Sequence, residues 1–162
     1  MFEHPVKVRW RDVDALGHVN HAVFLTYLEE ARDAFYAQVL RTDPHYVVAR
    51  IEIDLRAEVR YPDSQVTVRI EAESVGRTSL TTRETILTPA GEAAALARVV
   101  TVRWDAGQRQ PIPFSEAERV QLAAAIEVHS QVPSLTLLSA DVELNTAATA
   151  EGMTVDDPNN HS

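Results

Sequence analysis

The chain has 162 residues, of which 45% are hydrophobic and 24% charged, a composition typical of a folded globular domain. A net charge of -9 argues against nucleic acid as the main partner, and the absence of cysteine excludes disulfides, thiolate metal sites and a cysteine nucleophile. No apolar run reaches the length of a membrane span, and the N-terminus lacks the layout of a secretory signal. We therefore expect a cytoplasmic protein with no membrane span.

A strand and a long helix are the first predicted elements. Residues 6–10 alternate apolar and basic side chains, which predicts a strand with one buried face. After Asn20, apolar residues recur every three to four positions, which predicts an amphipathic helix of about five turns. Its apolar stripe consists of Phe24, Tyr27, Leu28, Ala31, Phe35 and Val39. This broad stripe suits burial against a sheet, and Arg32 is expected on the opposite, polar side.

Four strands of alternating apolar and polar residues follow the helix. They are expected at 45–60, 66–72, 80–87 and 93–104. Tyr61–Ser64 and Pro89–Glu92 have the residues of turns, and Val75–Arg77 connects the second strand to the third. These strands predict an antiparallel meander. Because one helix covers only one face of such a sheet, its edges and outer face favour self-association, and we expect a homodimer or homotetramer.

A short helix is predicted after the last strand. Ser115 and Glu118 match a capping box, and the helix that it begins is expected to end near Glu127. Beyond Ser130 the periodicity weakens. Residues 132–138 are expected at most as a weak edge strand, and residues 146–162 as a disordered tail.

The C-terminal part also carries most of the net negative charge. From Gln121 to Ser162 there are six acidic residues and no lysine or arginine. Residues 1–120 therefore have a small net charge, which is compatible with a local basic patch that binds a phosphorylated ligand. We divide the chain into one domain over residues 1–130 and an acidic extension over residues 131–162.

The junction before the long helix holds more polar residues than a helix cap needs. Asp12 and Asp14 are two apart, so on an extended backbone they point the same way, and Gly17 can turn the chain. Asn20 is placed to cap the helix, which leaves the N–H of His21 and of the next two residues open to an oxyanion. A carboxylate beside such donors suits acyl transfer, because the donors polarise a carbonyl while the carboxylate attacks it or activates water.

Two segments of this region carry a family resemblance. Residues 12–21, DVDALGHVNH, and residues 27–32, YLEEAR, resemble the motif of the hotdog-fold thioesterases of the 4-hydroxybenzoyl-CoA thioesterase-like group. The likeness extends from residue 5 to about residue 128, with a similar turn at 75–79 and a similar last strand at 97–105. It implies an α+β hotdog fold, in which a five-stranded antiparallel sheet wraps around one long central helix, plus a short C-terminal helix.

The resemblance also implies an activity and its residues. It implies hydrolysis of an acyl-CoA, with coenzyme A as part of the substrate and no metal or other cofactor. Asp14 matches the family's catalytic aspartate, as nucleophile or general base, and the backbone N–H of His21 matches the donor to the thioester carbonyl. His21 and Phe24 replace the usual Asn and Tyr near the acyl pocket, which leaves the acyl preference open and gives His21 a titratable group.

Each candidate also has a structural alternative. Asp14 can bind turn amides, and Asp12 is expected to anchor the loop or pair with an arginine. His18 and Asn20 are candidates for substrate contact, but His18 can be a packed loop residue and Asn20 only a cap. The spacing of His18 and His21 is not on one continuous helix, so we expect no metal there.

The turn between the second and third strands of the meander is a second candidate region. Arg77, Thr78 and Ser79 are expected either to approach a coenzyme A phosphate or only to close the turn. Two other functions stay open: hydrolysis of acyl groups on acyl carrier protein, and binding of acyl-CoA without catalysis. The acidic extension would hinder an acidic carrier protein if it lay nearby, which favours free coenzyme A esters. A hotdog dehydratase is less favoured, because its pairing of a loop histidine with a helix carboxylate is not evident.

Overall fold

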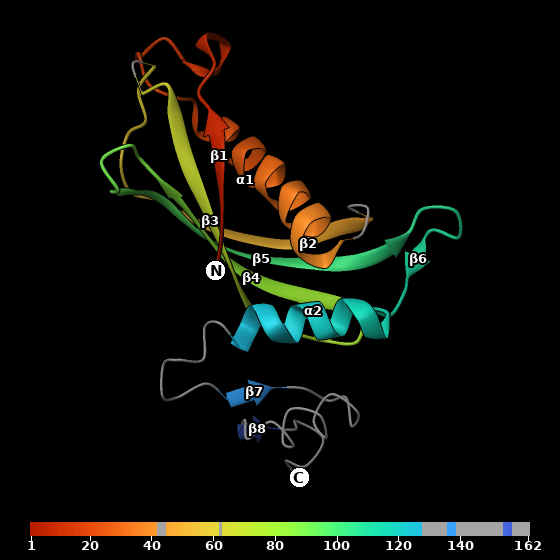
Figure 1. Cartoon of the computed structure of the whole chain (residues 1–162). Helices are drawn as coiled ribbons and strands as arrows, with labels where there is room; N and C mark the ends of the chain where they lie inside the picture. The colour runs from red at the N-terminus through yellow and green to blue at the C-terminus, as the bar shows by residue number, and fades with distance from the viewer. Residues whose placement is uncertain (42–44, 62, 128–135, 139–153, 157–162) are drawn as a thin grey trace.

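An antiparallel sheet curls around one long helix (Figure 1). The computed structural model describes residues 1–41, 45–61, 63–127, 136–138 and 154–156. The strands are β1 (Phe2–Lys7), β2 (Tyr46–Leu55), β3 (Gln65–Val75), β4 (Ser79–Leu87), β5 (Ala93–Asp105), β6 (Gln110–Pro111), β7 (Thr136–Leu138) and β8 (Thr154–Asp156). The helices are η1 (Trp10–Asp12, 3-10), α1 (His21–Phe35), η2 (Tyr36–Leu40, a π-helical continuation of α1) and α2 (Glu116–Glu127).

The sheet order is β1-β3-β4-β5-β2, with every neighbouring pair antiparallel. The short strand β6 pairs with the end of β5, so the sheet has one strand more than expected. The predicted meander holds for β3, β4 and β5 but is wrong for β2, which pairs with β5 at the far edge. The predicted strand also stops at Leu55, because the N–H groups of Arg56 and Ala57 both donate to the carbonyl of Ala94, which breaks the regular pairing with β5.

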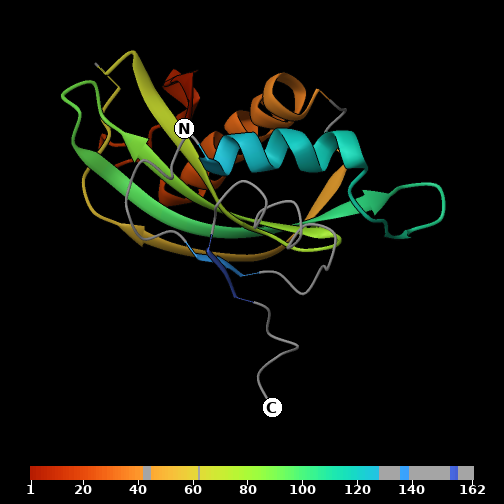
Figure 2. The same ribbon diagram turned by 60° about the horizontal axis from the view of Figure 1, so that its bottom comes forward.

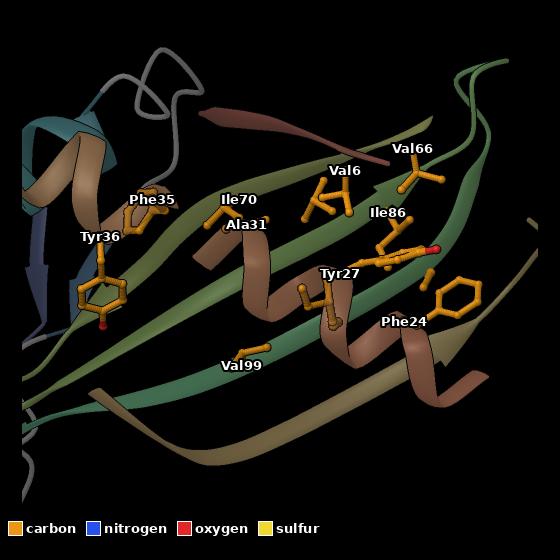
Figure 3. Packing of buried hydrophobic residues seen from close by; sticks show 14 of the residues in the cluster. Val6, Phe24, Tyr27, Ala31, Phe35, Tyr36, Val66, Ile70, Ile86 and Val99 are labelled. Atoms are coloured by element: carbon orange, nitrogen blue, oxygen red, sulfur yellow. The ribbon is translucent and has the colours of Figure 1, made fainter. Parts of the chain in front are cut away.

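The helix covers the concave face of the sheet. Most of the predicted stripe is buried, from Phe24 to Phe35, and Figure 3 shows these side chains between the helix and the strands. The inward residues of β3 are buried as predicted. The helix α2 lies on the same face as α1 (Figure 2) and packs against β3 and η2. The C-terminal helix thus covers the part of the concave face next to η2, at the C-terminal end of the central helix.

The first strand ends earlier than predicted. Val6 and Val8 are buried as expected, but β1 stops at Lys7 and Trp10 is 77% exposed in the 3-10 turn. The reason lies in the pairing, because Lys7 faces Gln65, which is the first residue of β3. Beyond that point the Val8 N–H still bonds to the carbonyl of Ser64 at 3.2 Å, and the chain then turns into η1.

A buried ion pair fixes α1 to the sheet. Arg32 Nη1 lies 2.6 Å from Glu84 Oε2 on β4, and the Thr82 hydroxyl donates to the other carboxylate oxygen at 2.8 Å. The prediction that Arg32 faces solvent is therefore wrong. Burial raises the pKa of Glu84, against the opposing effect of the Arg32 charge and the hydroxyl.

The C-terminal helix begins as the sequence predicts. The N–H and hydroxyl of Ser115 both donate to Glu118 Oε2, at 2.7 and 2.8 Å, and the Glu118 N–H donates to the Ser115 hydroxyl at 3.3 Å. This is the reciprocal bonding of a capping box. Glu118 also contacts Arg103 Nε at 2.7 Å, which joins the start of α2 to β5.

The predictions beyond α2 are only partly covered by the structure. Residues 132–135, the domain boundary at 130 and most of the predicted disordered tail lie outside the described residues. Within the tail, Thr154–Asp156 is a strand, and it pairs in parallel with Thr136–Leu138. The expected edge strand therefore joins a separate two-stranded sheet instead of the main one.

Candidate active site

Residues 13–19 form a small hairpin ahead of α1. Val13 and Val19 are bridged antiparallel, and the Asp14 N–H donates to the carbonyl of His18 at 3.0 Å. Gly17 lies at the tip with a φ of +84°, in the left-handed region that favours glycine. The prediction that Gly17 turns the chain is confirmed. Asp14 and His18 thereby face each other across the hairpin.

The two carboxylate oxygens of Asp14 have different surroundings: one accepts a backbone hydrogen bond, and the other faces His18. Asp14 Oδ1 accepts the N–H of Leu16 at 2.9 Å, which is the turn-binding role left open by the sequence. Its Oδ2 lies 3.6 Å from His18 Nδ1, and the side chain is 24% exposed. The turn bond sets the direction of the carboxylate, and the side chain remains partly exposed to solvent.

The start of α1 is capped by Asn20, as predicted. Its side chain accepts the N–H of Ala22 at 2.9 Å, and its carbonyl accepts the N–H of Val23 at 2.9 Å. His21 is exposed, and its own N–H has no acceptor within the described part of the chain. An open N–H at a helix N-terminus, where the helix dipole is positive, suits a carbonyl oxygen that gains negative charge.

Asp12 anchors the loop, which confirms its expected structural role. Its Oδ2 accepts both the N–H of Arg9, at 2.8 Å, and the hydroxyl of Tyr27, at 2.7 Å. Burial and the bond to Asp12 raise the pKa of Tyr27. The expectation that Asp12 and Asp14 point the same way is not met, because Asp12 belongs to a 3-10 turn and is buried against α1.

The segment that follows β2 supports the hairpin from the other side. The Val19 N–H donates to the carbonyl of Val59 at 2.7 Å, and His18 forms an isolated bridge with Arg60. Phe24, in the first turn of α1, is buried, with its ring 6.5 Å from that of Tyr27. Phe24 is thus part of the hydrophobic core.

The second candidate region lies at the opposite end of the sheet. Arg77 and Thr78 form the β3–β4 turn, and Ser79 is the first residue of β4; the Gly76 N–H donates to the Ser79 carbonyl at 2.8 Å. The carbonyls of Arg77 and Thr78 accept the N–H groups of Phe114 and Arg103, at 3.1 and 2.7 Å. β3 begins near the hairpin and has 11 residues, so the turn is displaced by roughly 35 Å along the sheet. One chain does not bring Asp14 and Arg77 together.

Two further properties concern the described residues only. They contain no group of three or more His, Cys, Asp or Glu side chains arranged to hold a metal ion. None of the described helices is both long and apolar enough to cross a membrane.

The match to a protein family covers most of the chain. The sequence model of the thioesterase-like superfamily matches residues 8–126. A thioesterase from Thermus thermophilus, solved in complex with coenzyme A and Zn, is 36% identical, with a TM-score of 0.67 over 77% of this chain and 93% of its own. The chain belongs to the thioesterase-like superfamily.

Other solved structures share the architecture. A predicted thioesterase from Bacillus stearothermophilus is 27% identical, with a TM-score of 0.68 over 77% of this chain and 96% of its own. A 1,4-dihydroxy-2-naphthoyl-CoA thioesterase from Synechocystis is 16% identical, with a TM-score of 0.66 over 75% and 95%, a likeness that shows the fold alone. Among curated protein sequences there is no significant match. The expected hotdog fold is confirmed.

Proposed function

We propose that the protein is an acyl-CoA thioesterase, which hydrolyses the thioester of an acyl-CoA to a free carboxylic acid and coenzyme A. Membership of the thioesterase-like superfamily supports the reaction class. The thioesterase from Thermus thermophilus, which was solved with coenzyme A, supports the ester as the substrate. The observation that carries the proposal is the accessible Asp14 carboxylate on a hairpin that leads directly into the capped start of α1.

The thioester carbonyl binds between this carboxylate and the helix start. The N–H of His21 donates to the carbonyl oxygen and stabilises the negative charge that develops there. As a general base, Asp14 takes a proton from water, the water oxygen attacks the carbonyl carbon, and the coenzyme A sulfur leaves and receives the proton. As a nucleophile, Asp14 forms a mixed anhydride, releases the thiolate, and water then cleaves the anhydride.

A second copy of the chain completes the substrate site. Arg77, Thr78 and Ser79 bind the phosphates of coenzyme A, and they are too far from Asp14 to do so within one chain. The edge strand β2 exposes Val47, Val48 and Leu55, which suits association with another copy. The protein therefore acts as a homodimer or homotetramer in which one copy supplies Asp14 and another supplies the turn.

The test is thiol release from a panel of aliphatic and aromatic acyl-CoA esters. The wild type should turn over at least one ester, and Asp14→Asn should lower kcat by roughly 100-fold or more, since the amide neither attacks nor accepts a proton. Asp105→Asn is the matched control, because Asp105 Oδ1 accepts the N–H of Gly107 in the same kind of turn. Unchanged turnover in Asp14→Asn would refute the role of the carboxylate, and no turnover by the wild type would refute the activity.

A further inference from the structure

A hydrogen bond between two buried side chains, Asp12 and Tyr27, ties the base of the hairpin to the body of α1. We propose that Asp12 and Tyr27 form a clamp that positions the Asp14 hairpin relative to the N-terminus of α1. This inference rests on the proposed function, in which Asp14 and the His21 N–H act on the same carbonyl. Neither clamp residue touches the substrate; both act by fixing where Asp14 lies.

The clamp closes the base of the hairpin. Asp12 immediately precedes the hairpin and Asn20 immediately follows it, and the Asn20 N–H donates to the Asp12 carbonyl at 2.9 Å. The side chain of the same Asp12 accepts the Tyr27 hydroxyl at 2.7 Å. Tyr27 lies in the second turn of α1, beyond the capped first turn. The hairpin is thereby attached to the rigid part of the helix as well as to its end.

Both members of the clamp are buried. Asp12 is 5% exposed and Tyr27 is fully buried. One carboxylate oxygen, Oδ2, receives both the Tyr27 hydroxyl and the Arg9 N–H, while the Arg9 guanidinium is engaged with Glu30 at 2.8 Å. Hydrogen bonds to a carboxylate in such surroundings are among the stronger ones in proteins, and a buried oxygen that loses a donor is left partly unsatisfied.

The contacts of Asp14 itself do not position it relative to the helix. Its bonds to Leu16 and His18 lie within the hairpin, so they would survive a movement of the hairpin as a whole. The backbone attachments of the hairpin run to Val59 and Arg60, which lie in a loop, and Val19 is buried in the core without a directional bond to α1 among the described residues. A displacement of about 1 Å between reacting groups can cost up to roughly 100-fold in rate, so the clamp has a direct effect on turnover.

Tyr27→Phe removes the clamp bond and keeps the ring, and Tyr46→Phe is its matched control. The Tyr46 hydroxyl also donates to an aspartate of α1, Asp33 Oδ1, at the same 2.7 Å, but at the other end of the helix. We expect Tyr27→Phe to lower kcat by roughly tenfold or more with KM changed less than about twofold, and Tyr46→Phe to keep kcat within about twofold. Asp12→Asn, which retains one acceptor oxygen, should give an intermediate loss.

Hydrogen–deuterium exchange tests the clamp without any substrate. The amides of Leu16, Gly17 and Val19 should exchange faster in Tyr27→Phe than in the wild type, and should be unchanged in Tyr46→Phe. Unchanged hairpin exchange in Tyr27→Phe would overturn the clamp, and so would equal losses of kcat in the two variants. If the wild type cleaves no ester, the proposed function fails by itself, while faster hairpin exchange in Tyr27→Phe alone still supports the clamp.

Discussion

Arg32 and Glu84 form an ion pair in which both side chains are almost completely buried, although they are 52 positions apart in the sequence. Removing one member leaves the other as an unpaired buried charge, which is more costly than the loss of the contact alone. We expect Arg32→Met to lower the free energy of unfolding by about 3–5 kcal/mol, as measured by urea denaturation.

The double variant Arg32→Met with Glu84→Gln tests whether the loss of stability comes from the isolated charge that a single substitution leaves. It should lose clearly less than the sum of the two single variants, because no isolated charge remains. Arg50→Met is the control, since Arg50 and Glu52 form a pair that is mostly exposed. Equal losses in Arg32→Met and Arg50→Met would contradict the importance of burial.

Alanine substitutions at Gly17 and Gly91 distinguish the effect of backbone strain on stability from an effect on turnover. Their φ angles are +84° and +81°, and a Cβ at either position meets no atom within 4 Å. Alanine should therefore destabilise the protein by a similar amount at both sites, about 1 kcal/mol, through backbone strain alone. Only Gly17→Ala should also lower kcat, because Gly17 shapes the hairpin that carries Asp14. Equal kcat values in the two variants would show that the hairpin tip is not important for turnover.

The N-cap of α2, Ser115, is a suitable control for the N-cap of α1, Asn20. Asn20→Ala and Ser115→Ala each remove a capping side chain, and each should cost about 1 kcal/mol of stability. Asn20→Ala should in addition reduce kcat, since fraying of the first turn displaces the N–H of His21. Steady-state kinetics on both variants at matched fractions folded is the measurement. A loss of kcat in Ser115→Ala as large as in Asn20→Ala would mean that general destabilisation is the cause.

Local sequence patterns predicted the features that depend on interactions between residues close in sequence. The apolar stripe of α1, the cap at Asn20, the turn at Gly17 and the capping box of α2 depend on residues within one or two turns of each other, and all four are confirmed. The burial of Arg32 was not predictable in this way. It depends on Glu84, whose position opposite the helix is set by the pairing of strands far along the chain.

In the candidate site, too, the features that depend on neighbouring residues were predictable, and those that depend on strand pairing were not. The hairpin and the helix start are contiguous in sequence, so their proximity followed from the motif and the cap. The sequence predicts Arg77 only as part of a second candidate region, because the family pattern contains no distances between this turn and Asp14. The register of β3 then separates them by most of the sheet length. The position of β2 at the far edge was missed as well, because alternation predicts a strand but not its neighbour.

Tyrosine burial predicts how stability falls at alkaline pH. Tyr36 is 1% exposed and bonds to the Thr101 hydroxyl at 2.8 Å, and burial raises its pKa from 10.0 to about 12. Between these pH values the tyrosine is deprotonated in the unfolded chain and still protonated in the folded one. The contribution of Tyr36 to the free energy of unfolding is therefore complete below pH 10 and is lost as the pH rises toward 12. The shift corresponds to an upper limit of about 3 kcal/mol.

Tyr36→Phe should therefore weaken the pH dependence of unfolding between about pH 10 and about pH 12, in urea titrations at fixed temperature. Some dependence should remain, because burial also raises the pKa of Tyr27 and Tyr46. At neutral pH the variant should lose about 1 kcal/mol, through the missing bond to Thr101. Tyr61→Phe is the control, since Tyr61 is exposed and its replacement should leave the slope as in the wild type. A slope in Tyr36→Phe as steep as in the wild type would show that the Tyr36 proton is not linked to folding.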